Sequence, residues 1–194
     1  MRSLAITKAI WSKSKISKPL PSDTPKNIAL TGFMAVGKSV VGQRLAERLR
    51  LSFVDLDHVI EDREGMPIRE IFVIKGEAYF RSLEKQVLKE ILERDRQVIA
   101  TGGGAVLDDD NLRLLKKRSR LICLTAQVEK LLQRSGSGKE RPLLKGDDKR
   151  QRIERLLRQR EKSYDQAHFT IDTTRLSVDE VVEQIPFNLR GTLS

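Results

Sequence analysis

The segment GFMAVGKS, residues 32–39, decides the fold class, because its G-x-x-x-x-G-K-S spacing is that of a loop that wraps phosphate groups. It follows the apolar run NIALT (27–31) and precedes a segment in which Val41, Leu45 and Leu49 recur on one helical face. The backbone N–H groups of such a loop, together with the N-terminus of the helix behind it, form an anion site. The sequence therefore predicts a strand, a phosphate-binding loop (P-loop) and a helix.

Four residues of this loop have a physical reason to be there. Gly32 lets the chain leave the strand sharply, and Gly37 can adopt a positive φ beside the phosphates. Lys38 is expected to reach the β- and γ-phosphates of a nucleotide, and the hydroxyl of Ser39 is expected to ligate Mg²⁺. The loop alone predicts a nucleotide-binding fold and does not identify the acceptor of a phosphoryl group.

The rest of the chain alternates short apolar runs with longer amphipathic segments. Strands are predicted at 27–31, 52–56, 97–101, 120–125 and 168–172. Helices are predicted at 38–50, 57–64, 68–74, 77–94, 109–118, 126–134, 149–166 and 177–186. Short, nearly continuous apolar strands separated by helices are typical of a parallel sheet covered on both faces. The predicted fold class is α/β, with three layers.

Charge and composition divide the 194 residues into one domain and two ends. Residues 1–26 carry six basic side chains and one acidic one, which is half of the net charge of +10, and they are predicted to be a disordered extension. Their basic, serine-containing composition fits an organelle transit peptide, a bacterial extension or a start assigned too far upstream equally well. We expect a single domain over 27–188 and a short tail over 189–194.

Several function classes are disfavoured by the same composition. The single cysteine, Cys123, excludes an internal disulfide and a cysteine-rich metal site, and its apolar surroundings predict a buried strand. No window approaches about 18 uninterrupted apolar residues, so no membrane association is expected. Only 5% of the residues are aromatic, and they do not alternate with basic residues as in a base-stacking surface. We therefore expect no specific nucleic acid as a partner.

Three further patterns could carry chemistry. Asp55 and Asp57 end the second predicted strand; one could hold Mg²⁺ through water while the other accepts a proton, although Asp57 could equally cap the next helix. The run TGGGAV (101–106) follows the third strand and permits close approach of a ligand, or forms a plain tight turn. Arg81 and Glu84 are spaced to pair on a helix, which by itself would more often be a surface ion pair.

Together these segments resemble one enzyme family. GFMAVGKS, DLD, GEAYFRSLE, ATGGGAVL, ERPLL and REKSY occur in the order seen in shikimate kinases, and the resemblance extends from about residue 27 to residue 185. It implies a nucleoside-monophosphate-kinase-like fold with a five-stranded parallel sheet, a helical substrate-binding region at about 57–84 and a mobile lid at about 134–148. The implied reaction is ATP-dependent phosphorylation of the 3-hydroxyl of shikimate, giving shikimate 3-phosphate and ADP.

The resemblance also implies roles on the nucleotide side. Lys38, Asp57 and Arg141 match catalytic residues, Arg141 being the arginine of the lid. Ser39 matches the magnesium hydroxyl, and Asp55 the acid that assists Mg²⁺ through water. The implied ATP-binding set is Gly32, Ala35, Val36, Gly37, Lys38, Ser39, Val40, Arg134 and Arg141, with Arg134 near the adenine.

On the acceptor side, the resemblance implies that Asp57 contacts the ring hydroxyls of shikimate and that Arg81 holds its carboxylate, with Glu84 orienting the site. Arg160 is implied to be a second carboxylate contact. The implied substrate-binding set is Asp57, Arg81, Gly102, Gly103, Gly104 and Arg160. Two guanidinium groups suit a carboxylate, and an aspartate suits hydroxyls.

Two residues depart from the family pattern. Ala35 stands where the family often has glycine, and Val40 where it often has threonine. The methyl group of Ala35 could alter nucleotide affinity if that position needs a positive φ. Because the donors of the loop are backbone groups, Ala35 and Val36 can still supply them.

Two alternatives remain beside this expectation. One is a related P-loop kinase that acts on another small hydroxy acid such as gluconate. The other is a nucleotide- or nucleic-acid-binding module without kinase activity that uses the basic extension. We expect a monomer in the cytoplasm, with a plastid as the minor alternative because of that extension.

Overall fold

The computed structural model describes residues 27–135 and 148–191, which form a five-stranded sheet with the strand order β2-β3-β1-β4-β5. Every neighbouring pair of strands is parallel. The predicted α/β class and the five parallel strands are confirmed. The strands are β1 (Asn27–Gly32), β2 (Ser52–Asp55), β3 (Gln97–Ala100), β4 (Ser119–Thr125) and β5 (Phe169–Asp172).

The predicted helices are present, with small shifts at their ends. They are α1 (Lys38–Leu49), α2 (Leu56–Glu64), α3 (Ile68–Ile74), α4 (Gly76–Ile91), α5 (Asp109–Arg118), α6 (Val128–Arg134), α7 (Lys149–Tyr164) and α8 (Val178–Gly191). A 3₁₀ turn, η1 (Ala105–Leu107), was not predicted. Helix α8 continues into the expected tail. The extension 1–26 and lid residues 136–147 lie outside the described residues. None of the described helices has the length and apolar character needed to span a membrane.

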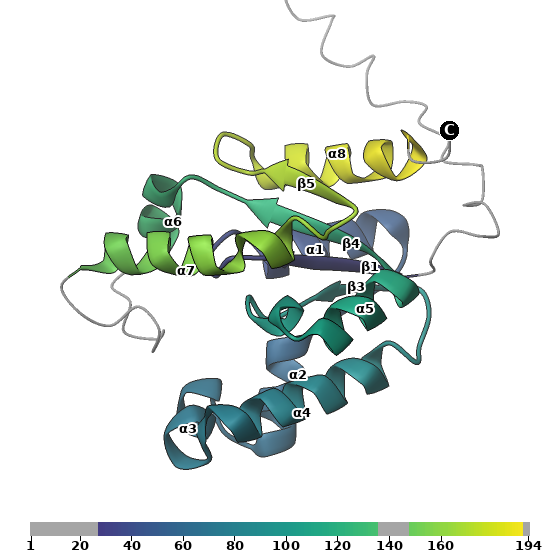
Figure 1. Cartoon of the computed structure of the whole chain (residues 1–194). Helices are drawn as coiled ribbons and strands as arrows, with labels where there is room; N and C mark the ends of the chain where they lie inside the picture. The colour runs from purple at the N-terminus through teal and green to yellow at the C-terminus, as the bar shows by residue number, and fades with distance from the viewer. Residues whose placement is uncertain (1–26, 136–147, 192–194) are drawn as a thin grey trace, which may run out of the picture.

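The sheet separates two apolar layers, because successive side chains on a strand point to opposite faces. Ile28 of β1 packs with Leu45 of α1 and Val181 of α8, whereas the next residue, Ala29, packs with Leu88 of α4 on the other face. Figure 1 shows α8 on one side of the sheet and α4 and α5 on the other. The result is the predicted three-layer arrangement.

The order of the strands fixes where a ligand can bind. From the central strand β1 the chain first visits β2 and β3 on one side of the sheet, and then crosses to β4 and β5 on the other. Ligands of open α/β sheets bind at the carboxyl ends of the strands, where the direction of winding changes. The phosphate loop follows β1, Asp55 ends β2 and the glycine run follows β3, so all three meet at this edge.

Cys123 has the structural position that its surroundings predict. It lies on β4 and is buried, and burial raises the pKa of its thiol to about 12. A thiol with such a pKa stays protonated and unreactive at neutral pH. Cys123 is therefore a small core residue.

The first prediction concerns Gly32, which has a φ of +131° and closes on the neighbouring strand. A Cβ atom there would lie 2.1 Å from the backbone oxygen of Leu124 in β4. We expect Gly32→Ala to cost more than about 4 kcal/mol of unfolding free energy, or to prevent folding, because two paired strands would have to separate. Denaturant titration followed by circular dichroism measures the loss.

The matched control is Gly65→Ala at the C-terminus of α2. Gly65 also has a positive φ, +66°, but no described atom lies within 4 Å of the position of its added Cβ. This substitution should cost only the conformational strain of alanine, about 1–2 kcal/mol. Similar losses for the two variants would contradict the close contact at Gly32.

Candidate active site

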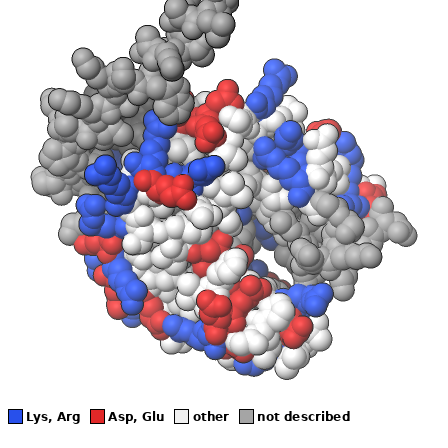
Figure 2. All heavy atoms as spheres, turned by 180° about the vertical axis from the view of Figure 1, so that it is seen from behind, with Lys and Arg blue, Asp and Glu red and all other residues white. Residues whose placement is uncertain are grey.

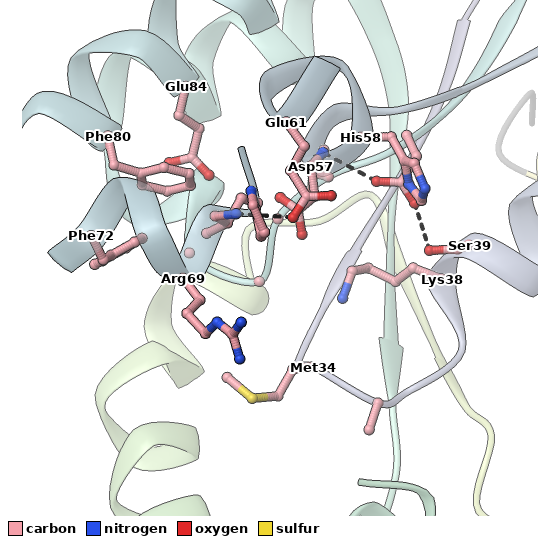
Figure 3. Close-up of a pocket in the computed structure, with 18 of the residues that line it drawn as sticks. Met34, Lys38, Ser39, Asp57, His58, Glu61, Arg69, Phe72, Phe80 and Glu84 are labelled. Carbon is pink, nitrogen blue, oxygen red and sulfur yellow. Dashed lines mark hydrogen bonds between the residues drawn. The ribbon is translucent and has the colours of Figure 1, made fainter. Parts of the chain in front are cut away.

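A cavity of about 840 Å³ opens at the carboxyl edge of the sheet, between the phosphate loop, α2, α3 and α4. Figure 3 shows side chains from these elements converging on it. Most of the predicted site residues line this one cavity: Ala35, Gly37, Lys38, Ser39, Val40, Asp55, Asp57, Arg81, Gly102, Gly103, Gly104 and Arg160. Residues that are up to 125 positions apart in the sequence numbering, from 35 to 160, are thereby brought together.

The loop adopts the shape that its glycines predict. Gly37 has a φ of +106° and precedes α1, whose residue Val41 donates its N–H to the Gly37 carbonyl at 2.9 Å. The Nζ atom of Lys38 donates to the carbonyl oxygens of Gly32 and Phe33, at 2.9 and 3.0 Å. Lys38 thus folds back across the loop and places its positive charge at the centre of the turn.

Ala35 does have the positive φ at which an alanine could alter nucleotide affinity. Its φ is +65°, so an alanine occupies a left-handed position where glycine would be relaxed. A non-glycine residue in this region costs about 1–2 kcal/mol, and it persists only when its surroundings hold it. The loop therefore stores backbone strain at Ala35.

Ser39 and Asp55 lie in direct contact. The Ser39 hydroxyl donates to Oδ2 of Asp55 at 2.6 Å, and Oδ1 of Asp55 accepts the N–H of Asp57 at 3.1 Å. Asp55, and not Asp57, is therefore the N-cap of α2. Among the described residues, no group of three or more His, Cys, Asp and Glu could hold a metal. Two adjacent oxygen ligands fit Mg²⁺, which takes one or two protein oxygens and completes its shell with water and phosphate.

Asp57 lies in the first turn of α2 and not on an extended segment, and its carboxylate approaches that of Glu84. A Cβ atom on Gly102 would lie 2.9 Å from Oδ1 of Asp57 and 2.8 Å from Oε1 of Glu84. Burial raises the pKa of Asp57, with a further contribution from the charge of Asp55. Burial likewise raises the pKa of Glu84, to which Asp57 adds. The two acids are thus held in a place that disfavours their charge.

Arg81 is fixed by two acids of its own helix. Its NH1 atom donates to Oε2 of Glu84 at 2.7 Å, and its NH2 atom to Oε1 of Glu77 at 3.2 Å. The side chain of Glu84 is only 2% exposed, so the pair is not a surface ion pair. A Cβ atom on Gly104 would lie 2.9 Å from NH1 of Arg81. The guanidinium group is thereby held at one wall of the cavity.

Arg160 and Tyr164 of α7 bind the same backbone oxygen. The carbonyl of Gly103 accepts NH1 of Arg160 at 3.1 Å and the hydroxyl of Tyr164 at 2.8 Å. Burial raises the pKa of Tyr164 to about 12, so it remains a neutral donor. Arg160 also lies over the ring of Phe33, 5.5 Å from its centre. The glycine run forms a turn, in which the N–H of Ala105 donates to the Gly102 carbonyl at 3.2 Å, and charged side chains lie close to each of its three glycines. We call this run the glycine platform.

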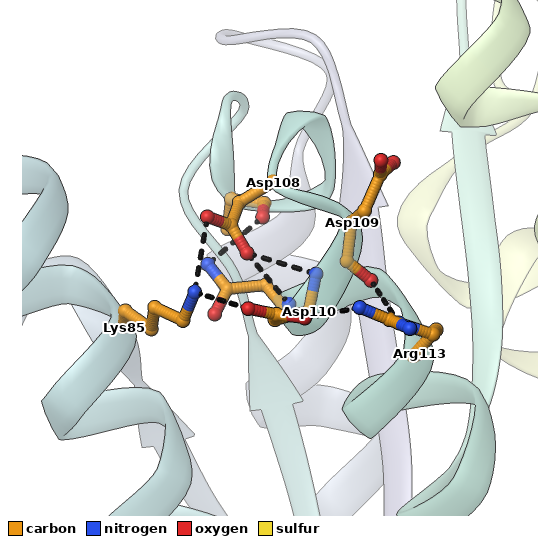
Figure 4. A network of polar contacts seen from close by, with 7 residues as sticks. Lys85, Asp108, Asp109, Asp110 and Arg113 are labelled. Atoms are coloured by element: carbon orange, nitrogen blue, oxygen red, sulfur yellow. Dashed lines mark hydrogen bonds and ion pairs between the residues drawn. The ribbon is translucent and has the colours of Figure 1, made fainter.

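A polar network holds this platform against α4 (Figure 4). Oδ1 of Asp108 caps α5 by accepting the N–H groups of Asp110 and Asn111, at 2.9 and 3.0 Å. The side chain of Asn111 donates to the carbonyl of Ala105, at 3.1 Å. Lys85, next to Glu84 on α4, donates to Oδ2 of Asp110 at 2.6 Å. The turn after the glycine run is thus tied to the helix that carries Arg81.

Three predicted nucleotide-side residues in the described part of the chain do not line the cavity. Gly32 ends β1, and its carbonyl oxygen accepts Nζ of Lys38. Val36 points its side chain into the core, where it is 1% exposed, and it offers only its backbone. Arg134, at the end of α6, donates NH1 to the carbonyl of Val36 at 3.2 Å. Arg141 lies outside the described residues.

The cavity also has lining residues that the sequence did not identify. Phe72 of α3 and Phe80 of α4 form an apolar wall with ring centres 4.7 Å apart. Glu61 could have been found, because it follows Asp57 by one helical turn; its Oε1 accepts the N–H of Ile68 at 2.9 Å and so caps α3. Tyr164, which does not line the cavity but donates to the Gly103 carbonyl, follows Arg160 by one turn in the same way. The aromatic residues gave no signal, because apolar helix positions predict a core equally well. Other unpredicted lining residues are Met34, His58, Pro67, Ile68, Arg69 and Thr101.

Comparison with known proteins gives a consistent result. Residues 34–189 match the family model described as "Shikimate kinase". The shikimate kinase of Thermodesulfovibrio yellowstonii is 46% identical over 82% of this chain and 92% of its own length. The shikimate kinase of Geobacter metallireducens is 43% identical over 92% of this chain and 98% of its own length.

Solved structures give the same family. The shikimate kinase from Acinetobacter baumannii, solved in complex with shikimate, has a TM-score of 0.83 and 39% identity, covering 89% of this chain and 97% of that one. The shikimate kinase from Aquifex aeolicus has a TM-score of 0.76 and 40% identity, covering 86% and 97%. The similarity thus extends over almost the whole of each relative.

The second prediction follows from the raised pKa of Asp57. Between the ordinary value of 3.8 and the raised value, the folded protein binds more protons at this group than the unfolded chain does. The folded state therefore loses stability as the pH rises through this window. Asp57→Asn removes the buried charge, so it should raise the Tm at neutral pH by a few degrees, since ~1 kcal/mol corresponds to roughly 2–4 °C at this size.

Thermal melts at a series of pH values check this prediction. The advantage of Asp57→Asn should shrink as the pH falls toward 4 and disappear below the ordinary pKa of 3.8. The exposed Asp62 on the same helix serves as the control, and Asp62→Asn should change the Tm by much less. A constant difference between Asp57→Asn and the parent at every pH would contradict the assignment.

Proposed function

The chain belongs to the shikimate kinase family, and we propose that its cavity is where the family's reaction takes place. The protein catalyses ATP-dependent phosphorylation of the 3-hydroxyl of shikimate, giving shikimate 3-phosphate and ADP. One structural observation most strongly supports the proposal that the reaction takes place in this cavity. A phosphate loop and a platform of three glycines, flanked by two arginines and by carboxylates, open into the same space. Such a space can hold a phosphoryl donor and a small hydroxy acid next to each other.

On the donor side, we propose that the loop binds the phosphates of ATP. The N–H groups around Gly37 and the charge of Lys38 would neutralise them, and phosphoryl transfer needs mainly such alignment and charge compensation. The proposed adenine contact is Arg134, beside the loop. Arg141 is proposed as the lid arginine, and that proposal rests on the family resemblance alone.

We propose that Ser39 and Asp55 hold Mg²⁺, Asp55 through water. Their contact at 2.6 Å supports this, because it places the hydroxyl and the carboxylate close enough to serve one hydrated cation, the hydroxyl directly and the carboxylate through a bound water. When bound, Mg²⁺ supplies positive charge to the phosphate oxygens. Ser39 begins the helix after the loop and Asp55 ends β2, so the site would also fix the distance between these elements.

On the acceptor side, Arg81 and Arg160 are proposed to hold the carboxylate of shikimate, and Asp57 its 3-hydroxyl. A guanidinium group pairs well with a carboxylate, and both arginines flank the glycine platform. Asp57 would orient the hydroxyl and accept its proton as the phosphoryl group is transferred. Its raised pKa makes it a better base than an ordinary aspartate, provided that it is ionised at the working pH.

The alternatives fit the cavity less well. A module without kinase activity has no need of buried carboxylates that disfavour their own charge, as Asp57 and Glu84 do. On the face seen in Figure 2, lysines and arginines lie among acidic residues and do not form one continuous basic field. A gluconate kinase remains the nearest enzyme alternative. We further propose a monomer in the cytoplasm with no nucleic acid or membrane partner, as expected from the sequence.

The third prediction is the choice of acceptor. With Mg·ATP, ADP release should depend on shikimate, and kcat/KM should be at least about 100-fold lower for gluconate, because a site built to hydrogen-bond one set of hydroxyls rejects another. A coupled ADP-release assay with a panel of hydroxy acids measures this. A preference for gluconate would overturn the substrate. Folded protein without shikimate-dependent turnover would overturn the function.

The fourth prediction separates the two sides of the cavity. Lys38→Ala should lower kcat by about 100- to 1000-fold, as the loss of one charge-stabilising donor does in other enzymes. Arg81→Ala should instead raise the KM for shikimate by about 10- to 100-fold with a smaller change in the KM for ATP, because it removes charged hydrogen bonds to the acceptor. Steady-state kinetics with each substrate varied in turn distinguishes the two effects.

The control is Arg113→Ala on α5, which removes an exposed guanidinium group paired with Asp110, outside the cavity. It should leave both KM values unchanged. An Arg81→Ala variant that binds shikimate with near-native affinity would refute the placement of Arg81 at the acceptor carboxylate.

A further inference from the structure

Thr173 stands outside the cavity, yet it joins several elements of the nucleotide side. It follows β5 and is 2% exposed. Its hydroxyl accepts NH1 of Arg134 at 3.0 Å and lies 3.0 Å from the carbonyl oxygen of Thr125, to which it donates. Its backbone carbonyl accepts NH2 of Arg134 at 3.1 Å, and its N–H donates to the same Thr125 oxygen at 2.8 Å. Thr173 is therefore bonded to the end of β4 and to the end of α6.

Arg134 connects Thr173 to the phosphate loop. The NH1 atom of Arg134 that reaches Thr173 also donates to the carbonyl of Val36 at 3.2 Å. The Thr173 hydroxyl itself lies 3.5 Å from that carbonyl. Because a hydroxyl has a single hydrogen, it serves Thr125 at the shorter distance, and Arg134 carries the bond to the loop. The guanidinium group thus bridges Thr173 and Val36.

Val36 directly follows the strained residue of the loop. Ala35 has a φ of +65°, which an alanine keeps only when neighbouring contacts hold it. The contacts on Val36 are of that kind: its side chain is 1% exposed in the core, its N–H reaches the Phe33 carbonyl at 3.4 Å, and its carbonyl binds Arg134. The Val36 N–H belongs to the peptide that follows Ala35, and the Val36 carbonyl belongs to the next peptide. Together these contacts hold the backbone on the C-terminal side of Ala35 and so restrict its torsion angles.

We propose that Thr173 is a positioning residue for the phosphate loop. Acting through Arg134 and the Val36 carbonyl, it holds the left-handed turn at Ala35 and so keeps the N–H groups of the loop aimed at the nucleotide phosphates. The proposal rests on the assignment of this loop to ATP. It assigns to Thr173 an effect on nucleotide affinity and none on the acceptor, because the Thr173 bonds described above lead to the loop and the strand ends and not to Arg81 or Arg160.

Thr173→Val tests the proposal, since valine keeps the shape of threonine and removes the hydroxyl. We expect the Kd for ADP and the KM for ATP to rise about 5- to 10-fold, because a hydrogen bond to a charged group is lost. The KM for shikimate should stay within about 2-fold, which is below the effect of one such bond. Thr173→Ser keeps the hydroxyl and should restore ADP binding. Calorimetric titration with ADP, without shikimate, gives the affinity.

Thr174→Val is the matched control. Thr174 is the next residue, and its hydroxyl accepts the N–H of Gln127 at 2.9 Å and donates to Asp172, without a described contact to the loop. It should bind ADP as the parent does. An equal loss in Thr173→Val and Thr174→Val would overturn the proposal, because the effect would then belong to the whole turn.

A second background tests the link to Ala35. In the Ala35→Gly variant, glycine adopts the left-handed conformation with little strain, so the loop depends less on the contacts of Val36, Arg134 and Thr173 to keep its shape. Thr173→Val should then weaken ADP binding by only about 2-fold, a clear departure from additivity for residues in one network. The same 5- to 10-fold loss in both backgrounds would overturn the role of the strained turn.

Arg134→Gln covers the case in which Thr173→Val fails to fold, because Arg134 is exposed. Inorganic triphosphate, which has no adenine, is the probe in that titration. Weaker binding of triphosphate supports the bridge to the loop, whereas a loss confined to ADP overturns it and indicates an adenine contact. If the parent protein binds neither ADP nor triphosphate, the assignment of the loop fails. If the parent binds both and the variants bind equally well, only the role of Thr173 fails.

Discussion

The absence of Cβ atoms at Gly102, Gly103 and Gly104 is the constraint on which the acceptor side of the cavity depends. Each glycine lets a different charged group come close to the backbone: Asp57 and Glu84 at Gly102, Arg160 at Gly103 and Arg81 at Gly104. A side chain at any of them would occupy space that these groups now use. The lack of side chains also leaves the carbonyl of Gly103 accessible to Arg160 and Tyr164, which both donate hydrogen bonds to it. Arginines from two helices that are far apart in sequence are thereby placed on one platform.

The close approach has an electrostatic consequence. Asp57 and Glu84 lie near the same glycine, and burial disfavours the charge of both, so the folded protein holds them at a cost in stability. Arg81 offsets part of that cost, because it pairs with the nearly inaccessible Glu84 at 2.7 Å. Removing one partner of such a pair would leave an uncompensated buried charge. The burial of Asp57 lowers the stability of the folded protein, and the same burial raises the basicity of the carboxylate. The proposed role of Asp57 as a base therefore has a cost in stability.

The sequence predicted those parts of the structure that depend on local rules. Strand and helix positions followed from hydrophobic periodicity, the positive φ of Gly37 from the loop motif, and the pairing of Arg81 with Glu84 from helical spacing. Contacts made by the backbone across the fold had no such signal. Nothing local indicated that Tyr164 would donate to the carbonyl of Gly103, or that Arg134 would bridge Val36 and Thr173. These depend on which strand ends lie side by side, and the strand order is a property of the whole chain.

The two sides of the cavity are supported by different elements. The acceptor platform is held by α4, α5 and α7, through Lys85, Asn111 and Tyr164. The phosphate loop is held from the ends of β4 and β5, through Arg134 and Thr173. The sides meet at the end of β1, where a Cβ atom on Gly103 would lie 3.2 Å from the Gly32 carbonyl. At this point two glycine backbones approach each other without side chains between them. A change in the strain of the loop, such as alanine in place of glycine at position 35, can therefore alter the affinity for nucleotide while the arginines around the acceptor keep their positions.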